Sequence, residues 1–174
     1  MFKWLFGGGK GDEGNAAASE TRELISLSRT LETTPDKAFS VFVERLNTWW
    51  PREFTWGKDR LAQIGIEPRY GGRAFERTTD GLVSVWGKVL ALDRPNHIVI
   101  AWQIRPDRTA EPEEALASRL DIRFITNDAG KTQLLLVHRD FPRHGEGWEK
   151  YKAEMAKGWP KLIDAYATEL AKAG

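Results

Sequence analysis

The chain of 174 residues contains no cysteine. Disulfide bridges, thiolate metal sites and a cysteine nucleophile are therefore excluded, and the composition fits a reducing compartment such as the cytoplasm. An excess of one charge is also missing, because 26 basic residues stand against 25 acidic ones and the formal net charge is +1. We therefore expect neither nucleic acid nor an anionic membrane surface as the main partner.

Long apolar runs are missing as well. No stretch approaches the roughly 18 apolar residues of a membrane-spanning helix, so stable membrane insertion is not expected. Residues 1–6 are mostly apolar, but three glycines follow at once, whereas an export signal needs an apolar stretch of roughly 7 to 15 residues. Glycine, alanine and charged residues then predict a flexible tail over residues 1–20. The remaining stretch, 21–174, has the length of one domain.

The sequence also lacks the common motifs for metals and nucleotides. The three histidines, His97, His138 and His144, do not have the spacing of metal ligands on one helix, so no metal site is predicted. The glycines before Lys10 lack both the spacing of a phosphate-binding loop and a preceding strand. We therefore expect no cofactor and no intrinsic nucleotide hydrolysis.

Short segments with alternating apolar residues, separated by turn signals such as Gly71-Gly72 and Asp80-Gly81, predict an antiparallel meander. The seven predicted strands are residues 24–31, 61–67, 73–79, 82–92, 97–104, 118–126 and 131–139. In the fourth strand two apolar sets alternate, so its inward face is left undecided. Thr34 and Pro35 predict a helix start after the first strand, and Trp49-Trp50-Pro51 is expected to end that helix, because a proline disfavours a helical residue before it. The Pro- and Glu-rich piece 105–117 is expected to be a loop that could overhang a pocket.

The final quarter of the chain predicts a long amphipathic helix over residues 148–170. Apolar side chains recur there at steps of three and four, which places them on one helical face. These residues are Trp148, Tyr151, Met155, Trp159, Leu162, Tyr166 and Leu170. One interpretation is that this face only completes the core, and the other is that it covers a pocket above the sheet. The order of elements is typical of an α+β helix-grip fold.

Several short motifs occur in an order that resembles a known family. They are Trp49-Trp50-Pro51, Gly71-Gly72-Arg73, Phe75-Glu76-Arg77, Asp80-Gly81, Trp86-Gly87-Lys88-Val89-Leu90, Ala101-Trp102-Gln103-Ile104, His138-Arg139-Asp140-Phe141, Arg143-His144-Gly145 and Gly158-Trp159-Pro160. Over residues 22–172 the chain resembles the SRPBCC or START-like superfamily, in the branch named after the activator of the heat-shock chaperone ATPase. The resemblance implies a curved sheet of about six to seven antiparallel strands wrapped around a long C-terminal helix, with short helices after the first strand.

The resemblance leaves three functions open. Similar proteins bind hydrophobic small molecules under the long helix, which suggests a lipid, an aromatic or a polyketide-like ligand. Some relatives are polyketide cyclases or dehydratases, and the co-chaperone of the branch stimulates a chaperone ATPase. The chain is therefore expected to be a binding domain, a metal-independent acid–base enzyme or a modulator of a chaperone, as a monomer or a homodimer.

Two residues are candidates for acid–base chemistry. His138 continues the inward face of its strand, where an imidazole could exchange a proton with a ligand, although a hydrogen-bonded histidine at the rim is the simpler interpretation. Glu76 alternates with Phe75, so an inward Glu76 would be a carboxylate in apolar surroundings. An outward, solvated Glu76 is the simpler interpretation. His144, in a polar loop, could cap the pocket.

The aromatic residues provide the candidate ligand contacts, because their large faces stack on planar molecules. Core packing is the alternative for each of them. The predicted ligand-binding residues are Trp50, Phe75, Trp86, Trp102, His138, Phe141, Tyr151, Met155 and Trp159.

Overall fold

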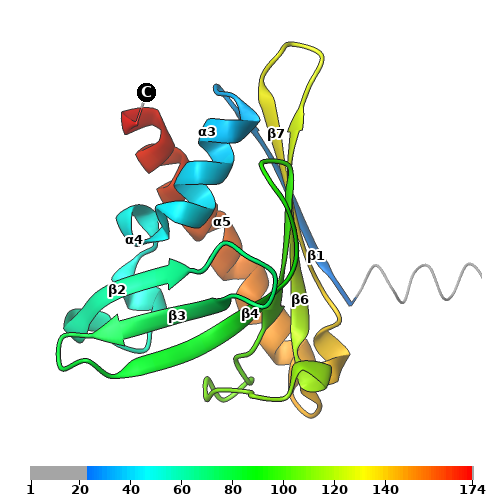
Figure 1. Ribbon diagram of the computed structural model, residues 1–174. Helices are drawn as coiled ribbons and strands as arrows, with labels where there is room; N and C mark the ends of the chain where they lie inside the picture. Colours follow the sequence, from blue (N-terminus) through cyan, green and yellow to red (C-terminus); the bar gives the residue numbers. More distant parts are fainter. Residues whose placement is uncertain (1–22, 174) are drawn as a thin grey trace, which may run out of the picture.

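The computed structural model describes residues 23–173, in which seven antiparallel strands form one curved sheet (Figure 1). The strands are β1 (Ile25–Leu31), β2 (Leu61–Ile66), β3 (Arg73–Thr78), β4 (Val83–Asp93), β5 (His97–Trp102), β6 (Ser118–Thr126) and β7 (Thr132–Arg139). Their order in the sheet is β1-β7-β6-β5-β4-β3-β2, so β1 pairs with the last strand and the rest is a meander. The predicted antiparallel sheet is confirmed, whereas the predicted tail over residues 1–20 lies outside the described residues.

Short helices follow β1, as predicted. They are α3 (Pro35–Phe39), the π-helical turn η1 (Ser40–Glu44) and α4 (Leu46–Trp49). The Thr34 hydroxyl accepts a hydrogen bond from the Lys37 N–H and so caps the first turn. The helical run ends at Trp50, which is extended because Pro51 disfavours a helical residue before it.

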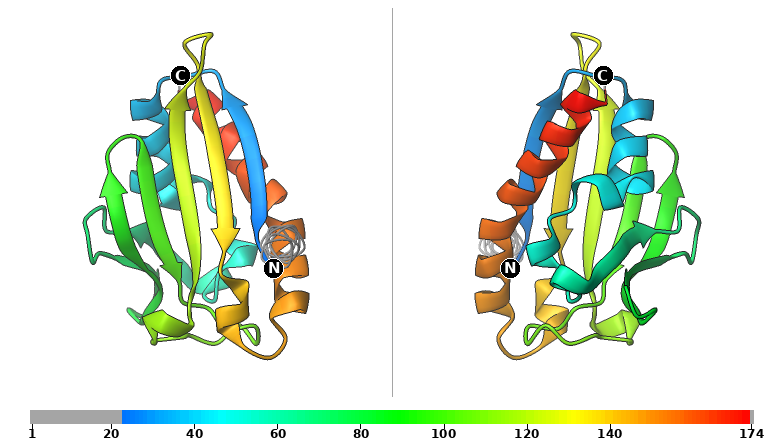
Figure 2. Two further views of the ribbon diagram at one scale, coloured as in Figure 1. Left: turned by 90° about the vertical axis from the view of Figure 1, so that its right-hand side faces the viewer. Right: turned by 90° about the vertical axis from the view of Figure 1, so that its left-hand side faces the viewer.

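Helix α5 (Trp148–Lys172) lies across the concave face of the sheet, and α3 and α4 cover the same face (Figures 1 and 2). Its buried residues are Tyr151, Met155, Trp159, Leu162, Ile163, Tyr166 and Leu170, while Trp148 is half-buried. The predicted aromatic face is therefore the face that meets the sheet. Four 3₁₀ turns complete the fold: η2 (Arg52–Phe54), η3 (Lys58–Arg60), η4 (Glu114–Leu116) and η5 (Phe141–His144).

Strand β4 contains two β-bulges. Opposite β3, Gly87 pairs with Ala74 and Val85 pairs with Phe75, so Trp86 is an extra residue on β4. A bulge bends the strand and redirects the side chain of the extra residue. Trp86 is consequently buried in the core on the concave side of the sheet.

The second bulge leaves Leu90 without a partner in β5. Each bulge changes which of the alternating positions faces the core. Trp86 and Val89 are both buried in the core and Leu92 packs against it, although strict alternation would place Val89 on the opposite face from the other two. The inward face of this strand could not be read from the sequence because no single alternation describes it.

Candidate functional site

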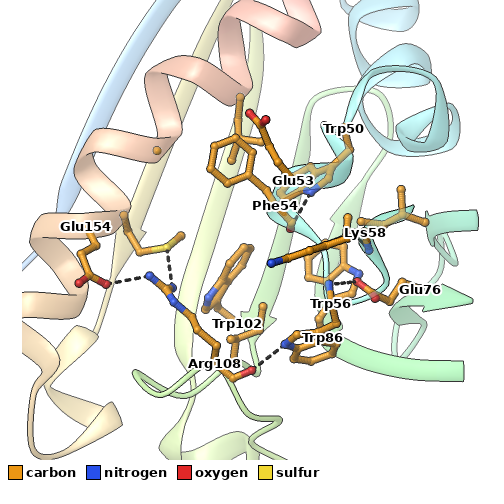
Figure 3. A pocket seen from close by; sticks show the side chains of 16 residues that line it. Trp50, Glu53, Phe54, Trp56, Lys58, Glu76, Trp86, Trp102, Arg108 and Glu154 are labelled. Atoms are coloured by element: carbon orange, nitrogen blue, oxygen red, sulfur yellow. Dashed lines mark hydrogen bonds and ion pairs between the residues drawn. The ribbon is translucent and has the colours of Figure 1, made fainter. Parts of the chain in front are cut away.

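A cavity of about 500 Å³ lies between the N-terminal half of α5, the loop before β2 and strands β4 and β5 (Figure 3). Most of its lining is apolar, and charged side chains lie around it. The lining residues are Trp50, Glu53, Phe54, Thr55, Trp56, Lys58, Ile64, Glu76, Trp86, Trp102, Ile104, Arg108, Glu154, Met155, Gly158 and Leu162. The volume falls in the range of about 300–1,000 Å³ that is usual for small-molecule sites.

Three tryptophans from different elements form much of the wall. Trp50 follows α4, and its ring stacks on that of Trp86 with the centroids 5.7 Å apart and an interplanar angle of 27°. Trp102, from β5, meets Trp86 edge-on at 5.5 Å. Trp159 of α5 packs edge-on against both Trp50 and Trp102 from outside the lining and so holds them in place.

Glu76 points to the concave side and is 3% exposed, so the expectation of an outward, solvated side chain is wrong. Its two carboxylate oxygens accept hydrogen bonds from the backbone N–H groups of Trp56 (3.1 Å) and Gly57 (2.6 Å). The strand pattern of β3 places Ala74, Glu76 and Thr78 on one face, and the donors come from a loop about twenty residues earlier. Glu76 therefore fixes the loop that covers the cavity.

Arg108 closes the cavity on the side of the 105–117 loop. Its backbone carbonyl accepts a hydrogen bond from the Trp56 indole (2.6 Å), and its guanidinium pairs with Glu154 of α5 (2.8 Å). The same guanidinium lies 4.7 Å from the centre of the Tyr151 ring. We call Trp56, Arg108 and Glu154 the Arg108 clasp. A second cavity of about 610 Å³ lies beyond it and shares Trp56 and Arg108 as walls.

His138 is fully buried and bonded at both ring nitrogens, so it does not lie at a rim. Nδ1 accepts a hydrogen bond from the Trp159 indole (3.1 Å), which leaves the proton on Nε2 to be donated to the Ser118 hydroxyl (2.8 Å). The Ser118 hydroxyl in turn donates to Nε2 of His144 (2.7 Å). We call these four residues the histidine chain.

Burial disfavours positive charge in the histidine chain. It lowers the pKa of His138 well below its ordinary value, and the nearby His144 lowers it further. Burial also lowers the pKa of His144 to about 4, although the Glu111 carboxylate acts in the opposite direction. Burial raises the pKa of Tyr151, whose hydroxyl accepts from Trp102 and donates to the Ile104 carbonyl, to about 12. These three side chains are therefore neutral near pH 7.

The structure places the predicted ligand-binding residues in two groups. Trp50, Trp86, Trp102 and Met155 line the cavity. Phe75 lies on the other side of β3 against Gly65, and the remaining four, His138, Phe141, Tyr151 and Trp159, are buried beside the cavity rather than in its lining. The two acid–base candidates are also separated, since Glu76 lines the cavity and His138 does not.

The covering-loop residues of the lining, such as Phe54, Trp56 and Lys58, were not predicted from the sequence. They lie between predicted elements, where no periodicity shows which side chains point inward. Arg108 belongs to the loop that was expected to overhang a pocket, but nothing in the sequence distinguished it from its neighbours. Among residues 23–173 no group of three or more metal-binding side chains could hold an ion. None of the described helices is both long and apolar enough to span a membrane.

Residues 32–171 match the family described as Activator of Hsp90 ATPase homolog 1-like protein. The match covers most of the chain, and the chain therefore belongs to this family, within the SRPBCC superfamily that the sequence motifs indicated. The comparison with curated proteins finds no match.

Solved structures agree with this assignment. Txn09, described as an anthrahydroquino-γ-pyrone synthase, is 30% identical, with a TM-score of 0.54 over 74% of this chain and 83% of its own. CalC from Micromonospora echinospora, described as a self-sacrificing resistance protein, is 25% identical, with a TM-score of 0.61 over 88% and 97% of the two chains. A protein from Nitrosomonas europaea, 14% identical with a TM-score of 0.64 over 88% and 97%, shares the fold.

Proposed function

We propose that this protein binds a planar aromatic small molecule in the cavity beneath α5. The observation that carries the proposal is the wall made of Trp50, Trp86 and Trp102 around about 500 Å³ of space. Aromatic faces offer a large contact area to a flat ring system at little cost in conformational entropy, whereas an extended lipid chain gains less from them.

The similarity to Txn09 supports an aromatic ligand, because the product named in its description is a fused, oxygen-bearing ring compound. Lipids are the main competing ligand class, and affinities for one aromatic ligand and one fatty acid separate the two classes.

No specific observation favours either alternative function, an acid–base enzyme or a docking module for a chaperone. An acid–base enzyme using His138 and Glu76 needs both groups at one ligand, but only Glu76 lines the cavity and its two oxygens already accept backbone hydrogen bonds. A docking module for a chaperone would combine a filled interior with an exposed apolar patch. The cavity is not filled, and the large exposed apolar side chains lie on several separate elements: Phe54, Tyr70, Leu82, Val83, Leu116 and Ile125.

Gly158 provides a direct test of the cavity. It lines the space from α5, and a Cβ placed on it would meet no atom within 4 Å apart from its chain neighbours and the backbone of its own helical turn. Gly158→Leu should therefore fill part of the cavity while improving helix propensity by roughly 0.5–1 kcal/mol. The matched control is Ala156→Leu, two residues away on the exposed face of the same helix.

The binding of 2-acetylnaphthalene and of dodecanoate would be measured by isothermal titration calorimetry. We expect wild type and Ala156→Leu to bind the naphthalene at micromolar concentration and more tightly than dodecanoate, and Gly158→Leu to lose at least tenfold in affinity with no loss of stability. Equal affinities of the wild type and Gly158→Leu would exclude the cavity as the site. Tighter binding of dodecanoate than of 2-acetylnaphthalene would mean that the ligand is a lipid and not a planar aromatic molecule.

A further inference from the structure

We infer that the ammonium group of Lys58 binds an anionic group, such as a carboxylate, on the planar aromatic ligand. The inference rests on the proposed function and deepens it, because it adds a negative charge to the ligand class. Lys58 belongs to the loop that covers the cavity, and it lines the space. Figure 3 shows its side chain extending from that loop over the cavity, toward the side on which Arg108 lies. An anionic group on a ligand in the cavity is therefore within reach of the ammonium group.

The ammonium group of Lys58 is free to bind a ligand. It forms no hydrogen bond or ion pair with any of residues 23–173. The other cation of the described lining, Arg108, is already in use, because its guanidinium pairs with Glu154 (2.8 Å) and donates to the Met155 sulfur (3.6 Å). Lys58 is therefore the cation of the described lining whose charge is not balanced within the protein.

The carboxylates of the described lining do not compete for Lys58. The two oxygens of Glu76 accept backbone hydrogen bonds from the covering loop, and Glu154 pairs with Arg108. Glu53 forms no ion pair with Lys58, and its carboxylate points away from the ammonium group (Figure 3). A carboxylate on the ligand would thus be the first close counter-ion of Lys58.

The backbone holds both cations of the lining in an uncommon conformation. Among residues 23–173 three non-glycine residues have a positive φ, and two of them are Lys58 (49°) and Arg108 (70°). This left-handed region is sterically disfavoured for side chains with a Cβ, and residues held in it cluster at binding sites. The Lys58 N–H donates to the Thr55 hydroxyl (2.9 Å), which fixes the turn. The turn is therefore preorganised, and an anion has to order only the Lys58 side chain.

The test compares two ligands of nearly the same shape, 2-naphthoate, which is anionic at pH 7.5, and 2-acetylnaphthalene, which is neutral. Their affinities would be measured by calorimetry for the wild type, Lys58→Gln, Lys58→Arg and Lys161→Gln. The last variant is the matched control, because Lys161 is an exposed lysine of α5 that does not line the cavity. The ratio of the two affinities within each protein cancels changes in the ring contacts that both ligands share.

The wild type should bind 2-naphthoate at least as tightly as 2-acetylnaphthalene. Lys58→Gln should lower the affinity ratio by about three- to fivefold, as for the loss of a partly exposed charge pair. Lys58→Arg should keep most of the ratio, and Lys161→Gln should leave it unchanged. An unchanged ratio in Lys58→Gln, an equal fall in Lys161→Gln, or a wild type that binds only the neutral ligand would overturn the inference and leave the proposed function intact. Failure of the wild type to bind either ligand would overturn both.

Lys58→Gly separates ligand binding from a structural role of this residue. Glycine adopts a positive φ without the steric cost of a Cβ, so this variant should unfold at about the same urea concentration as the wild type or higher. It should nevertheless lose as much of the affinity ratio as Lys58→Gln. A loss of stability together with equal losses of affinity for both ligands would show that Lys58 only holds the loop, and would contradict the inference.

Discussion

Helix α5 covers two regions of the sheet that are built from similar residues and packed in different ways. The filled region, under its C-terminal half, contains Phe39, Phe42, Trp49, Phe124 and Tyr166, whose rings meet at centroid distances of 4.9 to 5.8 Å. The open region, under its N-terminal half, contains Trp50, Trp86, Trp102, Met155 and Gly158 around the cavity. Both regions are aromatic, so composition alone does not distinguish a core from a binding site.

The difference lies in what is inserted beside α5. In the filled region α3, η1 and α4 lie next to the helix, and the Tyr166 hydroxyl donates to the Ala38 carbonyl (2.7 Å) (Figures 1 and 2). In the open region a loop that is anchored by Glu76 covers the space instead of a helix. The loop side chains leave about 500 Å³ of space under the helix, and this space is the candidate site.

The filled region should respond most strongly to truncation. Phe42→Ala removes a side chain that is packed on all sides and should lower the free energy of unfolding by about 3–5 kcal/mol. Affinity for 2-acetylnaphthalene should change less than about twofold, because Phe42 does not line the cavity. Urea unfolding and calorimetry measure the two effects. Met155→Ala is the counterpart in the open region, and a loss as large as that of Phe42→Ala would mean that the two regions are packed alike.

Loss of the Glu76 anchor of the covering loop should have the next largest effect on the free energy of unfolding. Glu76→Gln keeps the shape of the side chain but replaces one accepting oxygen by an N–H₂ group that faces a backbone donor. The mismatch should cost about 1–3 kcal/mol and weaken ligand binding through the loop. Urea unfolding measures the cost. Glu53→Gln is the control, because Glu53 is an exposed carboxylate of the same lining, and an equal effect of both changes would contradict the anchoring role.

Acid should destabilise the protein through the histidine chain. The pKa of His138 is lowered by burial, so below about pH 6.5 the unfolded chain binds a proton there that the folded protein does not. The stability is fully present above that pH and should fall by about 1.4 kcal/mol per pH unit below it. His144, with its pKa lowered to about 4, acts in the same direction.

Urea unfolding at pH 7.5, 6.5 and 5.5 would measure this dependence in a range above the titration of ordinary carboxylates. In His138→Gln the free energy of unfolding should depend less steeply on pH than in the wild type, whatever the stability of the variant at pH 7.5. The same dependence in both proteins would show that His138 is protonated in the folded state.

The Arg108 clasp should have the smallest effect on stability. Arg108 and Glu154 are both nearly half exposed, and pairs of this kind contribute about 0–1 kcal/mol. Arg108→Gln should therefore leave unfolding almost unchanged but open the side of the cavity and speed the dissociation of 2-acetylnaphthalene several-fold. Lys88→Gln is the matched control, because its pair with Glu114 is equally exposed and neither residue lines the cavity. Equal dissociation rates in the two variants would show that the clasp does not retain the ligand.

Much of the fold could be predicted because its signals are local. The period of apolar residues gave the strands and the long helix, and Thr34, Pro35 and Pro51 marked the limits of the helical run between β1 and β2. The signal failed at β4, where the bulges at Trp86 and Leu90 interrupt the alternation. A bulge depends on pairing with neighbouring strands, which no periodicity along one strand reveals.

The site was predictable in part. Trp50, Trp86, Trp102 and Met155 belong to elements with a recognisable inward face, and they do line the cavity. His138 was correctly placed on an inward face, but its partners Ser118 and Trp159 lie 20 and 21 residues away on other elements, so the sequence could not show that they occupy both ring nitrogens. Glu76 was misjudged for the same reason, since its backbone donors come from a distant loop.

The sequence by itself determined the class of this protein: an α+β domain with an antiparallel sheet, a long aromatic helix and no cysteine chemistry. Those properties follow from composition and from contacts between near neighbours in the chain. The tertiary structure alone decided which aromatic side chains are core and which surround a cavity, and which polar groups are satisfied. Burial and hydrogen bonding depend on distant segments that meet only in the folded protein, and the two occupied ring nitrogens of His138 are the clearest consequence.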